Sequence, residues 1–383
     1  MPDSKPPNEG GGNSDPQRYN EIFGEADIEL SPPAIKQFRP WHKPRKQFVR
    51  REQWLAELSQ LANDEDLDEK TFRYFSLPGQ DLLDIRYLLE SFCEPRKMTM
   101  RFLGFDQSTN EVAFNSAMQT IRHKELVENG STVHNLRLQD AGNPTSRARK
   151  HLHDHGPFQA INLDLCDGFA GPQIFSADNN LFAAMQAILE LQGRTQQSSL
   201  VFITTRIDDA NVDGAALEAF AKIIDSNVSS CLPFSEELEK HGQISEPSAA
   251  ALGAEDCFLV GIAKWLLEEA HKAKLDFDLR SVLTYKVNGD NALDDLASIA
   301  LRLSPNRDLT PDDHGLSSSK AAGIDLACAQ AKRIPGCVIQ RRSVDQRLAD
   351  DPEVRESCLS ESESLLTSAG MQIDGFRDWA EEK

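Results

Sequence analysis

The chain of 383 residues is acidic, with 61 aspartates and glutamates against 41 lysines and arginines and a formal net charge of -20. No apolar run reaches the roughly 18 residues that a membrane-spanning helix needs, and the polar residues 1–20 lack the apolar centre of a signal peptide. These features predict a soluble, cytoplasmic protein and exclude indiscriminate binding to polyanions, although one local basic patch is still compatible with them.

The seven cysteines lie far apart in the sequence and form no CxxC pair. Disulfide-rich and zinc-binding sequences place their cysteines in close, regular pairs. The spacing therefore predicts reduced, mostly buried thiols, with neither a disulfide framework nor a metal site.

The first 70 residues divide into two segments of opposite character. Residues 1–30 are polar, rich in glycine and proline and without periodicity, which predicts a disordered leader. Residues 31–70 form a basic, aromatic arm that ends in a predicted helix over 51–62. The densest part of the arm, KQFRPWHKPRKQFVRR at 36–51, carries seven bases among aromatic rings.

The basic arm is the most distinctive stretch of the sequence. Its cations can neutralise phosphates and its rings can stack on bases, so the candidates for contact with nucleic acid or a partner protein are Lys43, Arg45, Lys46 and Arg50. The alternative is an ordered arm that packs Phe38, Trp41 and Phe48 on the core and pairs its cations with surface acids.

Residues 71–304 alternate short apolar strands with helices. Strands are predicted at 72–77, 100–105, 133–138, 160–165 and 200–205, and helices at 81–92, 111–128, 180–191 and 256–273. The alternation indicates right-handed βαβ units, and two further strand-like runs at 281–287 and 296–303 predict a terminal antiparallel hairpin. The predicted fold class is α/β, a mainly parallel Rossmann-like sheet with helices on both faces. Residues 305–383 predict a polar linker and an acidic helical appendage.

Ligands of an open parallel sheet bind outside the carboxyl ends of its strands. The first predicted strand ends in Pro78-Gly79-Gln80-Asp81, where the glycine lets the backbone approach a ligand and the next helix offers free N–H groups. A plain strand-to-helix turn is the alternative. Asp106, after the second strand, can accept hydrogen bonds from a ribose diol or can cap the following helix.

Two further strand ends carry polar side chains. Asp140 and Ala141 follow the third strand, where they suit an adenine ring or begin a solvated loop. The fourth strand gives INLDLCDGF, in which Asp164 and Asp167 can position a substrate or accept a proton. Cys166 between them is a candidate nucleophile, with a buried inert thiol as the favoured alternative.

The alternating histidines of HLHDHG, residues 151–156, could bind a metal ion together with Asp154. The run lies at a predicted helix end, where solvated histidines are the ordinary explanation. No metal ion is therefore expected.

The order of these features resembles the class I S-adenosylmethionine-dependent methyltransferases over about residues 72–303. In that family the turn after the first strand holds the methionine end of the cofactor. The acid after the second strand holds its ribose, the residue after the third meets the adenine, and the loop after the fourth faces the methyl acceptor. The resemblance implies that Pro78, Gly79, Asp81, Asp106, Asp140 and Ala141 bind the cofactor and that Asp164 and Asp167 act on the acceptor. The phrase FQAINLDLCDGF is also similar to the fourth-strand motif of certain tRNA guanine methyltransferases.

The leading hypothesis is methyl transfer from S-adenosylmethionine to a nucleic acid or protein acceptor. The glycine turn is reduced to Pro78-Gly79-Gln80, and charged segments at both ends are typical of partner surfaces. The alternative is therefore a non-catalytic subunit of a multi-protein bacterial assembly, such as one for antiviral (phage) defence. A nicotinamide-dependent oxidoreductase is disfavoured because the GxGxxG fingerprint is missing.

Overall fold

The computed structural model describes residues 37–68, 70–108, 111–165, 168–171, 181–287, 293–306 and 326–381. Phe38–Lys383 form one compact unit. The predicted disordered leader at 1–30 lies outside the described residues, as do Cys166 and Asp167.

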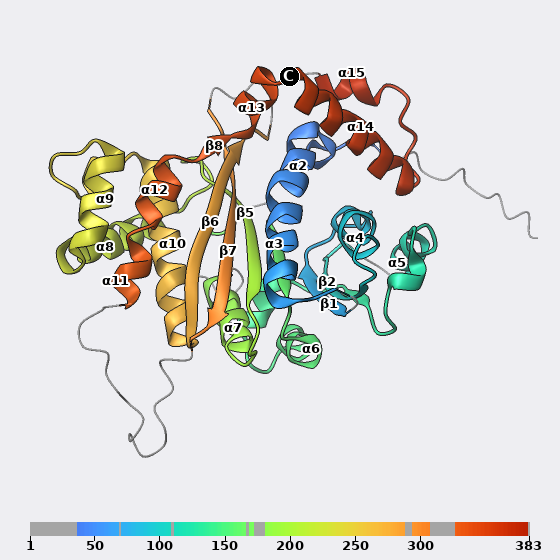
Figure 1. The fold of residues 1–383 in the computed structure, drawn as a ribbon, viewed down its shortest axis with the longest axis horizontal. Coiled ribbons are helices and arrows are strands. Elements are labelled where there is room, and N and C mark those ends of the chain that lie inside the picture. The colour runs from blue at the N-terminus through green and yellow to red at the C-terminus, as the bar shows by residue number, and fades with distance from the viewer. Residues whose placement is uncertain are drawn as a thin grey trace, which may run out of the picture. The chain divides into compact units, whose positions relative to one another are not determined.

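An eight-stranded mixed sheet forms the centre of this unit (Figure 1), in the order β3-β2-β1-β4-β5-β7-β6-β8. The strands are β1 Thr71–Ser76, β2 Thr99–Phe105, β3 Thr132–His134, β4 Ala160–Asp164, β5 Ser199–Arg206, β6 Leu275–Tyr285, β7 Leu296–Pro305 and β8 Arg342–Ser343. The first five pair in parallel, whereas β7 runs antiparallel to both β5 and β6. The predicted α/β class, with its parallel sheet and terminal antiparallel hairpin, is confirmed.

One face of the sheet is covered by the N-terminal helix, which passes without a break through α2 Pro44–Val49, the π-helical η2 Arg50–Leu55 and α3 Ala56–Glu65. The buried Trp54 of η2 packs on Phe202 of β5. Beside it lie α4 Leu83–Leu88 and η3 Leu89–Cys93, and the C-terminal helices α13 Val344–Asp350 and α14 Pro352–Ser368 pack against α2 (Figure 1). Phe38 completes this layer: its ring meets that of Phe376 edge to face and lies tilted against that of Trp379, both in α15 Phe376–Glu381.

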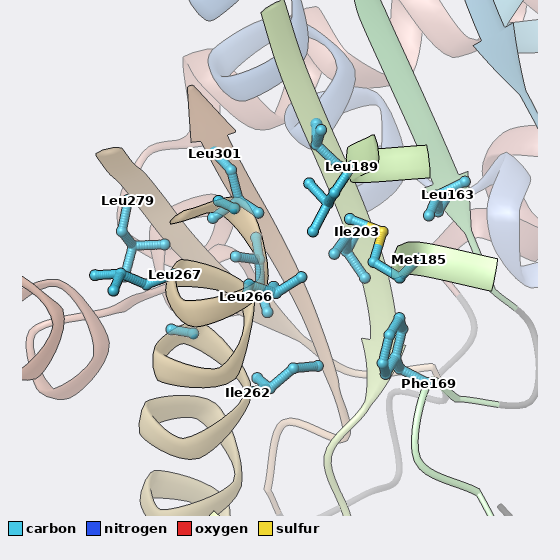
Figure 2. Packing of buried hydrophobic residues seen from close by; sticks show 14 of the residues in the cluster. Leu163, Phe169, Met185, Leu189, Ile203, Ile262, Leu266, Leu267, Leu279 and Leu301 are labelled. Atoms are coloured by element: carbon cyan, nitrogen blue, oxygen red, sulfur yellow. The ribbon is translucent and has the colours of Figure 1, made fainter. Parts of the chain in front are cut away.

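The opposite face is covered by α6 Arg147–His155, α7 Leu181–Gln192 and α10 Ala254–Lys272. Figure 2 shows Met185 and Leu189 of α7 beside Ile203 of β5, and Leu266 of α10 lying close to Leu301 of β7. Behind α10 lie α8 Gly214–Ser230, α9 Leu232–Gly242, α11 Leu326–Ala331 and α12 Ile334–Ile339. The sheet is therefore buried on both sides, as its apolar strands require.

The boundaries differ from the sequence prediction where tertiary packing decides local structure. The third strand ends at His134 rather than 138, because residues Leu138–Gly142 form a 3-10 helix, η5, that packs on α7. The basic stretch at 44–50 is helical and continuous with the predicted helix. The predicted helix at 111–128 is shorter, with α5 at Glu111–Gln119 and a 3-10 turn at Lys124–Leu126.

Two cysteines that are distant in the sequence form a disulfide, which corrects the expectation of reduced thiols. Cys231 ends α8 and Cys328 lies in α11, with their Cα atoms 5.5 Å apart across a sequence separation of 97 residues. Cys93, Cys257 and Cys358 are buried free thiols. The long separation explains why spacing alone gave no sign of the pair. Among the residues that the structure describes, no helix is long and apolar enough to cross a membrane.

Candidate functional site

The parallel strands β3, β2, β1 and β4 bring their carboxyl ends to one edge of the sheet, and we call this edge the carboxyl edge. Hydrogen bonds join the loops that follow these strands. Nε2 of Gln80 donates to the carbonyl of Ser108 over 3.3 Å, and Nδ2 of Asn135 donates to the carbonyl of Gln107 over 3.0 Å. The candidate residues after β1 and β2 thus belong to one connected surface.

The turn after β1 is built around Gly79, which has φ of +62° and nothing within 4 Å of the position of an added Cβ. Pro78 is buried under this turn against Gly104 of β2, where a Cβ would lie 2.9 Å from Cγ of Pro78. Gly104 is therefore a site residue that sequence reasoning missed, and a glycine inside an apolar strand was its signal. Because Leu82 adopts a left-handed conformation, α4 begins at Leu83 rather than directly after the glycine.

Asp106 lies at the end of β2, and its Oδ1 accepts hydrogen bonds from the backbone N and the Oγ of Ser108, over 2.9 and 2.7 Å. The carboxylate thus shapes the turn that follows the strand. The backbone N–H of Asp106 donates to the carbonyl of His134 in β3, and this bond fixes the turn to the neighbouring strand.

The two candidates after β3 lie in η5, and they differ in exposure. The side chain of Ala141 is fully buried in the core against α7. Asp140 is half-buried in the same 3-10 helix. Of these two candidates, Asp140 is the one whose side chain is partly exposed at this part of the carboxyl edge.

Asp164, the last residue of β4, belongs to a polar network centred on the ammonium of Lys46 in the N-terminal helix. Nζ of Lys46 donates to its Oδ1 over 2.7 Å, and also to the hydroxyls of Tyr285 and Thr204 over 3.2 and 3.3 Å. The same ammonium lies 4.9 Å from the centroid of the Trp54 ring, at the distance of a cation–π contact.

The two members of this ion pair differ in exposure. The side chain of Lys46 is 3% exposed and that of Asp164 is 31% exposed. Burial alone would lower the pKa of Lys46, but the attraction of Asp164 and Tyr285 outweighs it and raises that pKa. The ammonium of Lys46 therefore holds one oxygen of a carboxylate whose side chain is partly exposed.

A second buried chain of polar groups joins β4 to α4. Nδ2 of Asn162 donates to the hydroxyl of Tyr74 over 3.1 Å, and that hydroxyl donates to Oδ2 of Asp84 over 2.8 Å. Burial raises the pKa of Asp84 and lowers that of Arg50, which lies between Asp84 and Asp164 in the electrostatic network. The network extends the candidate site below the carboxyl edge.

The four candidate cations of the arm, Lys43, Arg45, Lys46 and Arg50, make contacts within the chain. Lys46 and Arg50 are 3% and 4% exposed, so phosphate cannot reach them, and Lys43 lies buried over the ring of Trp379. Arg45 pairs with Asp345 of α13 over 2.9 Å. The arm packs on the core and pairs with acids of the C-terminal helices, which is the alternative that the sequence left open, although Trp41 itself is 46% exposed.

A cavity of about 660 Å³ lies beyond β5, beside the loop after β4. Gly168 of that loop lies against Arg206, with 3.2 Å between an added Cβ and the Cβ of the arginine. Six acids line the cavity, while its two arginines are paired within it, Arg206 with Asp295 over 2.7 Å and Arg341 with Glu255 over 3.1 Å. The lining is acidic overall and repels a polyanion.

The histidine run does not converge on one point. His151 stacks on His134 of β3 with 3.8 Å between ring centroids, whereas Nδ1 of His153 lies 3.1 Å from Nη1 of Arg194. Burial, His151, His155 and Arg147 together lower the pKa of His134 to about 4. In the described part of the chain, no group of three histidine, cysteine or acidic side chains could hold a metal ion.

Comparison with known proteins adds a family but no activity. A model of the family described as PP_RS20740-like matches residues 35–381. None of the curated proteins matches the chain. The match covers the arm, the whole sheet and the C-terminal helices, and the chain therefore belongs to the PP_RS20740-like family.

Proposed function

We propose that the chain is a methyltransferase-like protein that binds S-adenosylmethionine at the carboxyl edge. One observation carries the proposal: a parallel sheet with a terminal antiparallel hairpin gathers the turn at Gly79, the carboxylate of Asp106 and the carboxylate of Asp164 at a single edge. In an open α/β sheet this edge is where ligands bind.

The residues at the edge fit the cofactor. Gly79 presents an open backbone surface, since nothing lies within 4 Å of the position of its missing Cβ. Asp106 follows the strand beside it, at the place where an acid binds a ribose diol. Asp140 in η5 would be the side chain that meets the adenine. These three residues, with Pro78 fixing the turn and Asp81 following it, are the proposed cofactor contacts.

Bound S-adenosylmethionine would supply a methyl group on a positively charged sulfur. The lone pair of the acceptor would attack the methyl carbon in line with the carbon–sulfur bond, and the sulfur would leave. The contribution of this chain is orientation and proximity. Asp164 at the end of β4 would receive a hydrogen bond from the acceptor and orient it, and Asp167 in the same loop is the second candidate. The acidic cavity beside this loop favours a protein acceptor over a nucleic acid.

Calorimetry with S-adenosylmethionine and S-adenosylhomocysteine tests the proposal. Binding should be lost in Asp106→Ala and kept in Asp154→Ala, an exposed acid on α6, which leads into the opposite end of β4. Absence of heat with both ligands refutes the proposal. Equal affinity in the two variants refutes the ribose assignment alone.

A second candidate function is a non-catalytic subunit that keeps the fold and joins partners. It is favoured by the buried ion pair of Lys46 with Asp164, which occupies one oxygen of the candidate catalytic acid. A folded chain that binds neither ligand but forms a stable complex with purified products of neighbouring genes would support this candidate.

A further inference from the structure

The two oxygens of the Asp164 carboxylate have different surroundings. Oδ1 accepts the 2.7 Å hydrogen bond from Lys46, whereas no described residue donates a hydrogen bond to Oδ2. The side chain is 31% exposed although the lysine that holds it is 3% exposed. The ion pair thus holds the carboxylate through Oδ1, and Oδ2 is the oxygen that accepts no hydrogen bond from a described residue.

Two buried cations lie near the carboxylate of Asp164. Lys46 is in direct contact with Asp164, and Arg50 is close enough for Asp164 to raise its pKa against the effect of burial. Asp84 is the other acid near Arg50, and burial raises its pKa. An outside cation at Oδ2 would lose hydration beside a carboxylate that the ammonium of Lys46, 2.7 Å away, already neutralises.

We propose that Lys46 is a positioning and specificity-determining residue, which holds Oδ1 of Asp164 so that Oδ2 receives an uncharged N–H or O–H group. The inference rests on the proposed function, because it names the acceptor of that site: an amide or hydroxyl rather than a lysine ammonium. An uncharged donor makes a hydrogen bond to a carboxylate at little cost in lost hydration.

The chemistry of the step balances with this assignment. The lone pair of the acceptor nitrogen or oxygen forms the new bond to the methyl carbon, and the carbon–sulfur bond breaks with its electrons left on sulfur. The acceptor proton passes to Oδ2 of Asp164 and from there to water. Lys46 keeps its proton throughout and keeps Oδ1 in place.

The test uses the full chain, labelled with 13C at the aspartate carboxyl carbons, and three probes of nearly equal shape: butyramide, n-butylammonium and butyrate. Asp164→Asn identifies the Asp164 signal. In the unchanged protein, butyramide should shift this signal at a concentration about tenfold lower than n-butylammonium does. In Lys46→Met, n-butylammonium should instead shift the signal at the lower concentration, because the carboxylate then has no ammonium beside it.

Two variants separate positioning from a structural effect. Lys46→Arg keeps the positive charge and should keep the order of the unchanged protein. Lys264→Met removes another buried lysine, paired with Glu268 on α10, and should also keep that order. If Lys46→Met does not fold, the order in which the probes shift the Asp164 signal of the unchanged protein and of Lys46→Arg still tests the inference.

Three results would overturn the inference: n-butylammonium or butyrate shifting the signal of the unchanged protein first, no response to any probe, or an unchanged order in a folded Lys46→Met. The titration contains no S-adenosylmethionine. Its failure is therefore distinct from a failure of the proposed function, which calorimetry with the cofactor detects.

Discussion

Replacing Lys46 by methionine removes the ammonium but keeps a side chain of similar length, so the change isolates the polar contacts of this residue. The ammonium makes three hydrogen bonds and two cation–π contacts, with the rings of Trp54 and Tyr285. Two unit charges about 4 Å apart attract by about 4 kcal/mol at the effective dielectric constant near a protein surface. The cost of burying the ammonium offsets part of this, and water reaches the 31% exposed Asp164 in the variant. The expected loss in unfolding free energy is about 1–3 kcal/mol.

Urea denaturation of Lys46→Met at neutral pH measures this loss, with Lys264→Met as the matched control. Lys264 is also buried, but it makes one contact of 3.1 Å with Glu268, whose side chain is 41% exposed, so its loss should cost about 0.5 kcal/mol. The difference between Lys46→Met and the unchanged protein should disappear as the pH rises through the raised pKa of Lys46, because the neutral amine no longer pairs. Equal losses in the two variants at neutral pH would refute the assigned contacts.

Three further predictions concern stability. Gly104→Ala should lower the unfolding free energy measured by urea denaturation by about 1–3 kcal/mol, because the new Cβ would lie 2.9 Å from Cγ of Pro78. An unchanged denaturation midpoint would show that the turn rearranges without loss of stability. Reduction of the Cys231–Cys328 disulfide should lower the unfolding free energy by about 2–4 kcal/mol, since the bond closes a loop across 97 residues, and equal midpoints with and without reductant would exclude it. His134 has its pKa lowered to about 4, so the unfolded chain takes up this proton first as the pH falls from 6.5, and folding is destabilised. The unfolding free energy of His134→Gln minus that of the unchanged protein should therefore be about 1 kcal/mol larger at pH 5 than at pH 8, a value that allows for the partial exposure of the ring. An equal difference at both pH values would contradict this.

The fold could be predicted from the sequence because its signals are local. Each strand of the parallel sheet is a short apolar run bounded by turn residues, and alternation with helices limits the topology to a few choices. The hairpin of β6 and β7 was visible for the same reason. The third strand was predicted too long because Leu138 is apolar. This residue lies in η5, which packs on α7, and local hydrophobicity does not distinguish such a position from one in a strand.

The candidate site could be predicted only in part, because its polar contacts join distant segments. Asp164 was visible at a strand end, but Lys46, its partner, lies 118 residues earlier in the chain. The basic arm suggested phosphate binding because composition shows which charges are present and not which acids they meet. The pairing of Arg45 with Asp345 and of Arg51 with Glu361 joins the two ends of the chain, and no spacing in the sequence encodes it.

Amide hydrogen exchange with and without S-adenosylhomocysteine reports where a ligand binds as well as whether it binds. Binding of the cofactor at the carboxyl edge should slow exchange in residues 77–82 after β1, 105–108 after β2 and 138–142 in η5, with no change in α8, α9 and α11 on the far side of α10. Unchanged exchange throughout, or protection confined to segments away from the carboxyl edge, would refute a cofactor site at this edge.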